Sequence, residues 1–257
     1  MFGFIKSLRR RRLLAEPFPQ HWEVLLRRHV RHYSIVGEAE RARLRDLVRV
    51  LIAEKEWVGC GGLHVTETMK LVIAASASVL ALGFDGFDAY RRVQSILIYP
   101  GPFRTPNPDD GYEDDELSDR VIGGQAWYRG PVILNWPDVE AEAAEPDLGF
   151  NLTIHEFAHQ LDFLDGETNG TPPLATREAE ARWERVMTAA YERHLDRLKS
   201  HRESFFTEHA GDDPGEFFAD ATEAYFCRPH DLEAEEPDVF NVLMDYFRCD
   251  PRPWFPA

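Results

Sequence analysis

The stretch NLTIHEFAHQLD, residues 151–162, carries the pattern H-E-x-x-H and decides the fold around it. Histidines four residues apart lie on one face of a helix, so the imidazoles of His155 and His159 can hold one Zn²⁺ ion. Glu156, next to the first histidine, can then act as general base on the water held by the metal. Apolar residues flank this polar stripe and predict a buried helix over about residues 149–162.

A catalytic zinc site needs a third protein ligand and an open position for water. Asp165 would end an extended motif, H-E-x-x-H-x-x-G-x-x-H, but an acidic residue stands where that motif needs glycine. Glu216 and Glu223 lie on one face of a second helix, predicted over residues 214–227. We favour Glu216 because Asp220, one turn later, would then accept a hydrogen bond from a ligating histidine.

The apolar run from Leu71 to Phe84 is 14 residues long. It is shorter than the roughly 20 residues that span a bilayer, and we interpret it as a buried helix. Helical spacing or strand-forming residues mark the other predicted elements. Helices are predicted over 21–31, 38–56, 176–197 and 237–248, and strands over 63–65, 93–99, 121–127 and 131–136.

The order of these elements predicts an α+β fold, mainly helical, with a small mixed sheet. The last two strands are expected to form a hairpin, turning at Arg129-Gly130. We expect one domain over residues 20–257, preceded by a basic tail over residues 1–19.

The chain has 257 residues and a formal net charge of −16, which argues against a general nucleic-acid binder. The charge is uneven, with +7 over residues 1–50 and −23 over residues 51–257. The basic segment near the start has two interpretations. It is either a solvated tail or an amphipathic segment that contacts anionic lipid or an acidic partner.

Three scattered cysteines, Cys60, Cys227 and Cys249, form no C-x-x-C pair. This argues against a thiolate zinc site and a disulfide framework, and it fits a reducing compartment. The first residues do not follow the order of a secretory signal, because the basic residues come after the apolar ones. We therefore expect a cytoplasmic protein with no membrane span.

Beyond H-E-x-x-H, the chain resembles the zinc-dependent peptidases related to Mlc titration factor A. The resemblance covers most of the chain from about residue 20 to 251. It rests on Tyr99-Pro100, Gly124–Trp127, Gly130–Trp136, Asn151–Asp162, Asp165-Gly166, Asn169-Gly170, Pro214–Ala219 and Asp250-Pro251.

This resemblance implies a zincin-like fold and a gluzincin-like metallopeptidase with one Zn²⁺ per chain. Matching the motifs makes His155, His159 and Glu216 the metal ligands and Glu156 the base. It also implies aminopeptidase-like cleavage of peptides and a link to a repressor of sugar uptake.

The chain departs from the family pattern at several positions. Relatives tend to have a tyrosine seven residues before the ligating glutamate, where this chain has His209, whose imidazole can donate the same hydrogen bond to an oxyanion. Asp220 stands where relatives often have an apolar residue. Glu116 replaces a histidine that in some relatives can reach the metal.

The sequence thus predicts a zinc metallopeptidase that acts on peptide or protein substrates. Residues 131–136 are expected to form the sheet edge that pairs with an extended peptide. The acidic loop over residues 104–119 would favour peptides with basic groups or a free amino terminus. The alternative is a regulatory protein with a structural zinc site that sequesters a transcriptional repressor; such a site would be closed by a fourth protein ligand.

Overall fold

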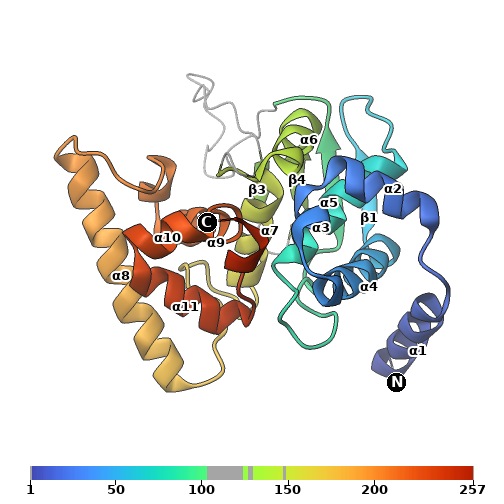
Figure 1. Ribbon diagram of the computed structural model, residues 1–257, viewed down its shortest axis with the longest axis horizontal. Coiled ribbons are helices and arrows are strands. Elements are labelled where there is room, and N and C mark those ends of the chain that lie inside the picture. Colours follow the sequence, from blue (N-terminus) through green and yellow to red (C-terminus); the bar gives the residue numbers. More distant parts are fainter. Residues whose placement is uncertain (1, 103–123, 127–129, 147–148, 257) are drawn as a thin grey trace, which may run out of the picture.

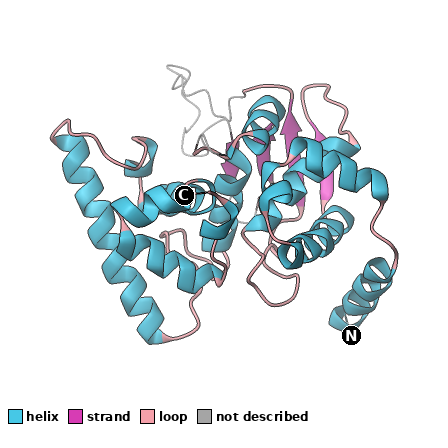
Figure 2. Cartoon of the chain, viewed as in Figure 1, coloured by secondary structure: helices cyan, strands magenta, loops and turns pink. Residues whose placement is uncertain are grey.

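The computed structural model describes residues 2–102, 124–126, 130–146 and 149–256 (Figure 1). Helices dominate this part of the chain, and the few strands gather in one sheet (Figure 2). The helices up to residue 79 are α1 (Phe2–Ala15), α2 (Gln20–His29), α3 (Arg31–Ile35), α4 (Glu38–Glu54) and α5 (Glu67–Val79). Those after the sheet residues are α6 (Trp136–Ala144), α7 (Leu152–Asp162), α8 (Arg177–Lys199), α9 (Pro214–Cys227), α10 (Pro229–Glu235) and α11 (Pro237–Phe247), with 3-10 turns η2 (His209–Gly211) and η3 (Arg252–Trp254).

The sheet is mixed, as predicted, and its strands run in the order β1-β2-β4-β3. β1 (Glu56–Gly59), β2 (Ser95–Tyr99) and β4 (Val132–Asn135) are parallel, whereas β3 (Gly124–Ala126) is antiparallel to β4. The prediction that residues 131–136 form a sheet edge is wrong. β4 pairs antiparallel with β3, as the predicted hairpin requires, but its other side pairs with β2 and is not open.

The first strand also differs from the prediction. The expected helix over residues 38–56 ends at Glu54, and residues 63–65 form no strand. The amide of Glu56 donates instead to the carbonyl oxygen of Gln94, which begins the parallel ladder with β2. Strand pairing between distant segments therefore outweighs the local helical pattern here.

The predicted buried helix is present as α5, and every residue from Leu71 to Val79 is buried. Thr66 caps its start by accepting a hydrogen bond from the amide of Met69. α5 packs against α2, α4, α6 and α7, so it forms the centre of the half of the molecule that contains the sheet.

Helices α8 to α11 form the other half, and the packing of α9 against α7 joins the two halves (Figure 1). Aromatic rings fix α9 against α11. The ring centroids of Phe226 and Phe247 are 4.9 Å apart, and those of Tyr225 and Phe247 are 5.6 Å apart. Such ring pairs contribute to stability beyond their buried area and hold α9 against α11.

Residues 2–15, which we expected as part of a basic tail, form helix α1. This helix is held against α4, because the Arg10 guanidinium donates to both carboxylate oxygens of Glu54 at 2.7 and 2.9 Å. Such a two-pronged ion pair fixes orientation as well as distance. None of the helices in the described part of the chain combines the length and apolarity needed to cross a membrane.

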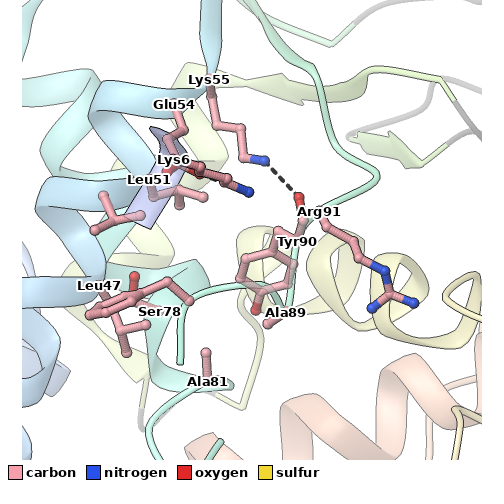
Figure 3. Close-up of a pocket in the computed structure, with 12 residues that line it drawn as sticks. Lys6, Leu47, Leu51, Glu54, Lys55, Ser78, Ala81, Ala89, Tyr90 and Arg91 are labelled. Carbon is pink, nitrogen blue, oxygen red and sulfur yellow. Dashed lines mark hydrogen bonds and ion pairs between the residues drawn. The ribbon is translucent and has the colours of Figure 1, made fainter. Parts of the chain in front are cut away.

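Lys55, which follows α4, is mostly buried. Its ammonium group donates to the carbonyl oxygens of Tyr90 and Val93 at 2.6 and 2.7 Å, and Figure 3 shows the first of these bonds. Burial lowers the pKa of Lys55 from 10.5 to about 8. The folded protein therefore releases this proton at a lower pH than the unfolded chain does.

Between about pH 8 and 10 the unfolded chain binds more protons at Lys55 than the native state, so Lys55 makes the free energy of unfolding rise with pH. The full gain from this group is at most about 3 kcal/mol. Urea unfolding at several pH values should show this rise in the wild type and in the control Lys199→Met, which changes an exposed lysine. Lys55→Met should lack it, and parallel curves for all three proteins would contradict the prediction.

Candidate metal centre

The two motif histidines lie on α7 and point the same way. Asn151 caps this helix by accepting a hydrogen bond from the amide of Ile154 at 3.0 Å. One turn then separates His155 from His159, and their Nε2 atoms are 3.3 Å apart. The i, i+4 spacing thus brings both imidazole nitrogens to one point, as the sequence predicted.

Glu216 reaches the same point from α9. Asp213 caps this helix through the amides of Gly215 and Glu216, and Pro214 occupies its first turn. The Oε2 atom of Glu216 lies 2.9 Å from the Nε2 of His155 and 3.5 Å from the Nε2 of His159. The loop after α7 and the first turn of α9 therefore decide where the third ligand candidate stands.

That loop is fastened by Asp162 and Gly170. The amide of Gly170 donates to Oδ2 of Asp162 at 3.0 Å, which ties the loop to the end of α7. Gly170 has a φ of +71°, and a Cβ there would collide with the backbone carbonyl of Pro214. Only glycine permits both this conformation and this approach, so Gly170 sets the spacing between α7 and α9.

The three atoms fit a tetrahedral ion. Bonds of about 2.0–2.1 Å from Zn²⁺ place neighbouring ligand atoms about 3.3 Å apart. The three separations between His155, His159 and Glu216 are 2.9, 3.3 and 3.5 Å. Two neutral imidazole nitrogens and one carboxylate oxygen are also the donor set that suits Zn²⁺.

His209 joins the cluster from η2. Its Nε2 is 3.0 Å from Oε2 of Glu216, and its Nδ1 is 2.9 Å from Oδ2 of Asp212. Its ring stacks on His155 with centroids 6.0 Å apart. One ligand atom from each of His155, His209 and Glu216 lies within 4.8 Å of the other two, so His209 is a further residue that could reach an ion at this point. The structure therefore places the predicted oxyanion partner beside the candidate metal ligands.

Glu223 has a different place from the one that we considered for it. Its Oε1 is 2.7 Å from Nδ1 of His155, and its Oε2 accepts from the amide of Asn151 at 2.6 Å. It therefore orients His155 from behind, the role that we had expected of Asp220. Asp220 instead accepts a hydrogen bond from the hydroxyl of Thr207. Seven-residue spacing placed Glu223 on the right face, but only the crossing of α7 and α9 shows which carboxylate meets His155.

Glu156 lies on α7 between the histidines and is 4% exposed. Burial raises the pKa of its carboxyl to about 8. Its Oε2 is buried and has no hydrogen-bond partner among the residues that the structure describes. Burying a carboxylate oxygen without a hydrogen-bond partner costs free energy. This indicates that Oε2 of Glu156 contacts a bound water or ligand when the site is occupied.

The surrounding charges keep Glu216 ionised. Burial opposes its ionisation, but hydrogen bonds from His155, His159 and His209 hold the pKa of its carboxyl well below the ordinary value. The pKa of His209 is raised to about 9, mainly by its hydrogen bond to Glu216. A carboxylate kept in its charged form is ready to bind a cation.

Two predicted features do not enter this description. Asp165, the other candidate ligand, lies on the loop after α7 and accepts from the amide of Glu167 at 2.9 Å, outside the cluster. Glu116 and the acidic loop over residues 104–119 lie outside the described residues.

The chain is similar to proteins of a known family. A family model described as glucose-regulated metallo-peptidase M90 matches residues 5–248. The Synechocystis sp. protein slr2042 is 32% identical over 95% of this chain and 89% of its own length. Mlc titration factor A of Yersinia enterocolitica is 34% identical over 84% of this chain and 81% of its own, and that of Yersinia pestis is 33% identical over 84% and 80%.

The family match assigns the chain to a class of proteins described as metallo-peptidases. The cluster of imidazole and carboxylate groups agrees with that description. More narrowly, the chain belongs to the glucose-regulated metallo-peptidase M90 family. The resemblance seen in the sequence is confirmed. Membership in a metallopeptidase family implies that the centre holds a metal ion.

Proposed function

We propose that the protein is a zinc metallopeptidase of zincin-like fold, with its peptidase domain over residues 20–257. The observation that carries this proposal is the triangle of His155, His159 and Glu216, whose separations match those around a tetrahedral Zn²⁺. His155 and His159 would bind one ion through Nε2, and Glu216 would bind it through Oε2. Glu223 would hold His155 in the required tautomer.

A Zn²⁺ ion held by these residues would supply Lewis-acid chemistry to the scissile carbonyl and to the attacking water. Glu156 would accept a proton from that water and pass it to the leaving amine. Its burial beside the ligand candidates and its unpartnered Oε2 support this role. His209 donates a hydrogen bond to the negative oxygen that forms on the substrate.

The substrate is a peptide or protein, and aminopeptidase-like cleavage is the activity that the family resemblance favours. We propose that an extended peptide pairs with the sheet through β3. This strand lies at the edge of the sheet and packs against α7, close to the metal ligands. The described cysteines are free thiols, which fits a reducing compartment, and we propose the cytoplasm as the location.

Removal and return of the metal test the proposal. The zinc-loaded wild type should cleave members of a peptide library, the metal-free protein should not, and added Zn²⁺ should restore cleavage. Peptides with free and with blocked amino termini, compared by mass spectrometry, distinguish exopeptidase from endopeptidase cleavage. A protein with one zinc per chain that cleaves nothing in a broad library would refute the enzyme proposal.

A regulatory role is the second candidate, and His209 is the observation that favours it. Its Nε2 lies 3.0 Å from the oxygen of Glu216 and would need only a small movement to become a fourth protein ligand. Four protein ligands close a zinc site and are typical of structural zinc. Relatives named Mlc titration factor A suggest a transcriptional repressor as the partner to be sequestered. This candidate requires stable binding of such a repressor by a protein that cleaves no peptide.

A further inference from the structure

Helix α1 uses one face to dock on the body of the protein. The ammonium group of Lys6 lies 3.0 Å from a carboxylate oxygen of Asp88 and 3.4 Å from one of Glu54. Arg10 contacts the same two carboxylates at 2.7 and 2.9 Å. Figure 3 shows Lys6 beside Glu54, and both line a pocket together with Lys55. Lys6 and Arg10 therefore form ion pairs with Glu54 and Asp88 and hold α1 against the rest of the protein.

The other face of α1 points into solvent. Ile5, Leu8, Arg9 and Arg12 stand at i, i+3, i+4 and i+7, so they share one face. Ile5 is 51% exposed and Leu8 is 40% exposed, which places both among the few large apolar side chains that the described chain leaves open. Both arginines are exposed, as is Arg11 beside them.

These three arginines, Arg9, Arg11 and Arg12, have no carboxylate partner in the part of the chain that the structure describes. Glu54 and Asp88 are already occupied by Lys6 and Arg10. The outer face of α1 therefore carries uncompensated positive charge together with two apolar side chains. The charge of −23 over residues 51–257 makes this face the opposite of the rest of the molecule.

We propose that the outer face of α1 binds a lipid bilayer rich in anionic headgroups. A helix lying in a membrane interface places its apolar side chains at the boundary of the acyl chains and its arginines at the phosphates. Ile5 and Leu8 are flanked by Arg9 and Arg12 in this arrangement. Negative headgroups would attract this face and repel the acidic body, so electrostatics would orient the protein on the membrane.

Vesicle co-sedimentation of the full chain tests this proposal, with phosphatidylcholine alone or mixed with phosphatidylserine. The wild type should bind only the mixed vesicles, and added salt should weaken the binding. Each arginine near an anionic surface contributes roughly five-fold, so replacing Arg9, Arg11 and Arg12 by glutamine should weaken binding by about 100-fold. Lys6 and Arg10 stay in place in this variant, so α1 keeps its contacts with the body.

A matched control changes the same charge elsewhere, with Arg177, Arg185 and Arg202 replaced by glutamine. These arginines are exposed, on or just after α8, and this variant should bind as the wild type does. Ile5→Ala with Leu8→Ala should weaken binding while its dependence on salt remains. The proposal is overturned if the wild type does not prefer anionic vesicles, or if both triple variants lose the same affinity. Binding to an acidic protein surface without binding to vesicles overturns it equally.

Discussion

Glu156→Gln is expected to slow peptide hydrolysis by about 1000-fold while one zinc ion stays bound per chain. Glutamine has nearly the same shape as glutamate but cannot accept the proton of the attacking water. Glu156 is buried next to the ligands, and its Oε2 has no partner among the described residues, so the substitution leaves the three ligand atoms in place. Removing a general base typically costs a factor of 100 to 10,000, and the expected value lies within that range.

The measurement combines the rate of cleavage of one peptide with metal analysis of the same sample. Glu180→Gln makes the same chemical change on the exposed side of α8 and should leave both the rate and the zinc content unaltered. If Glu156→Gln cleaves as fast as the wild type, Glu156 is not the base. If it loses its zinc, Glu156 acts on the metal site itself.

Glu216→Ala is expected to weaken zinc binding by at least 100-fold, because it removes one of the three proposed ligand atoms. The loss should exceed the 10- to 100-fold range that is usual when only a residue supporting a ligand is changed. His155 and His159 would remain, held 3.3 Å apart on α7, but two imidazoles alone do not complete a site. Titration against a competing chelator measures the affinity of each variant.

Two further variants serve as comparisons for the loss of zinc affinity in Glu216→Ala. Glu223→Gln should weaken zinc binding by 10- to 100-fold, because Glu223 contacts Nδ1 of His155, on the side of the ring away from the other ligand candidates. Asp165→Asn should leave the affinity unchanged, because Asp165 lies outside the cluster. A larger loss for Asp165→Asn than for Glu216→Ala would assign the third ligand to the extended motif instead.

The sequence predicted the elements whose signals are local. α9 begins at Pro214 and ends at Cys227, as expected, because its proline and its capping aspartate act within one turn. The i, i+4 spacing of His155 and His159 likewise needs only the geometry of a single helix. The choice of Glu216 as third ligand candidate also agrees with the geometry, since its carboxylate meets both imidazoles.

The sequence failed where distant segments decide the outcome. β4 lies inside the sheet because it pairs with β2 as well as with β3. The hairpin with β3 was predicted, but no local pattern in residues 131–136 shows the parallel neighbour β2, which lies more than 30 residues earlier in the chain. Glu223 and Asp220 share a helix face, so periodicity alone could not tell which of them meets His155. The basic residues of α1 resemble a solvated segment in the sequence. Only the folded chain shows that Arg10 pairs with Glu54 and Asp88, which are distant in the sequence.

The position of the ligand candidates on two different helices also affects the stability of the folded chain. His155 and Glu216 are 61 residues apart in sequence, and α7 and α9 join the two halves of the molecule. An ion held between them is a cross-link that closes a long loop, and such links restrict the unfolded chain strongly. The free energy of metal binding at this point would thus contribute to the free energy of folding. A chelator would then destabilise the packing between the two halves as well as remove the metal needed for activity.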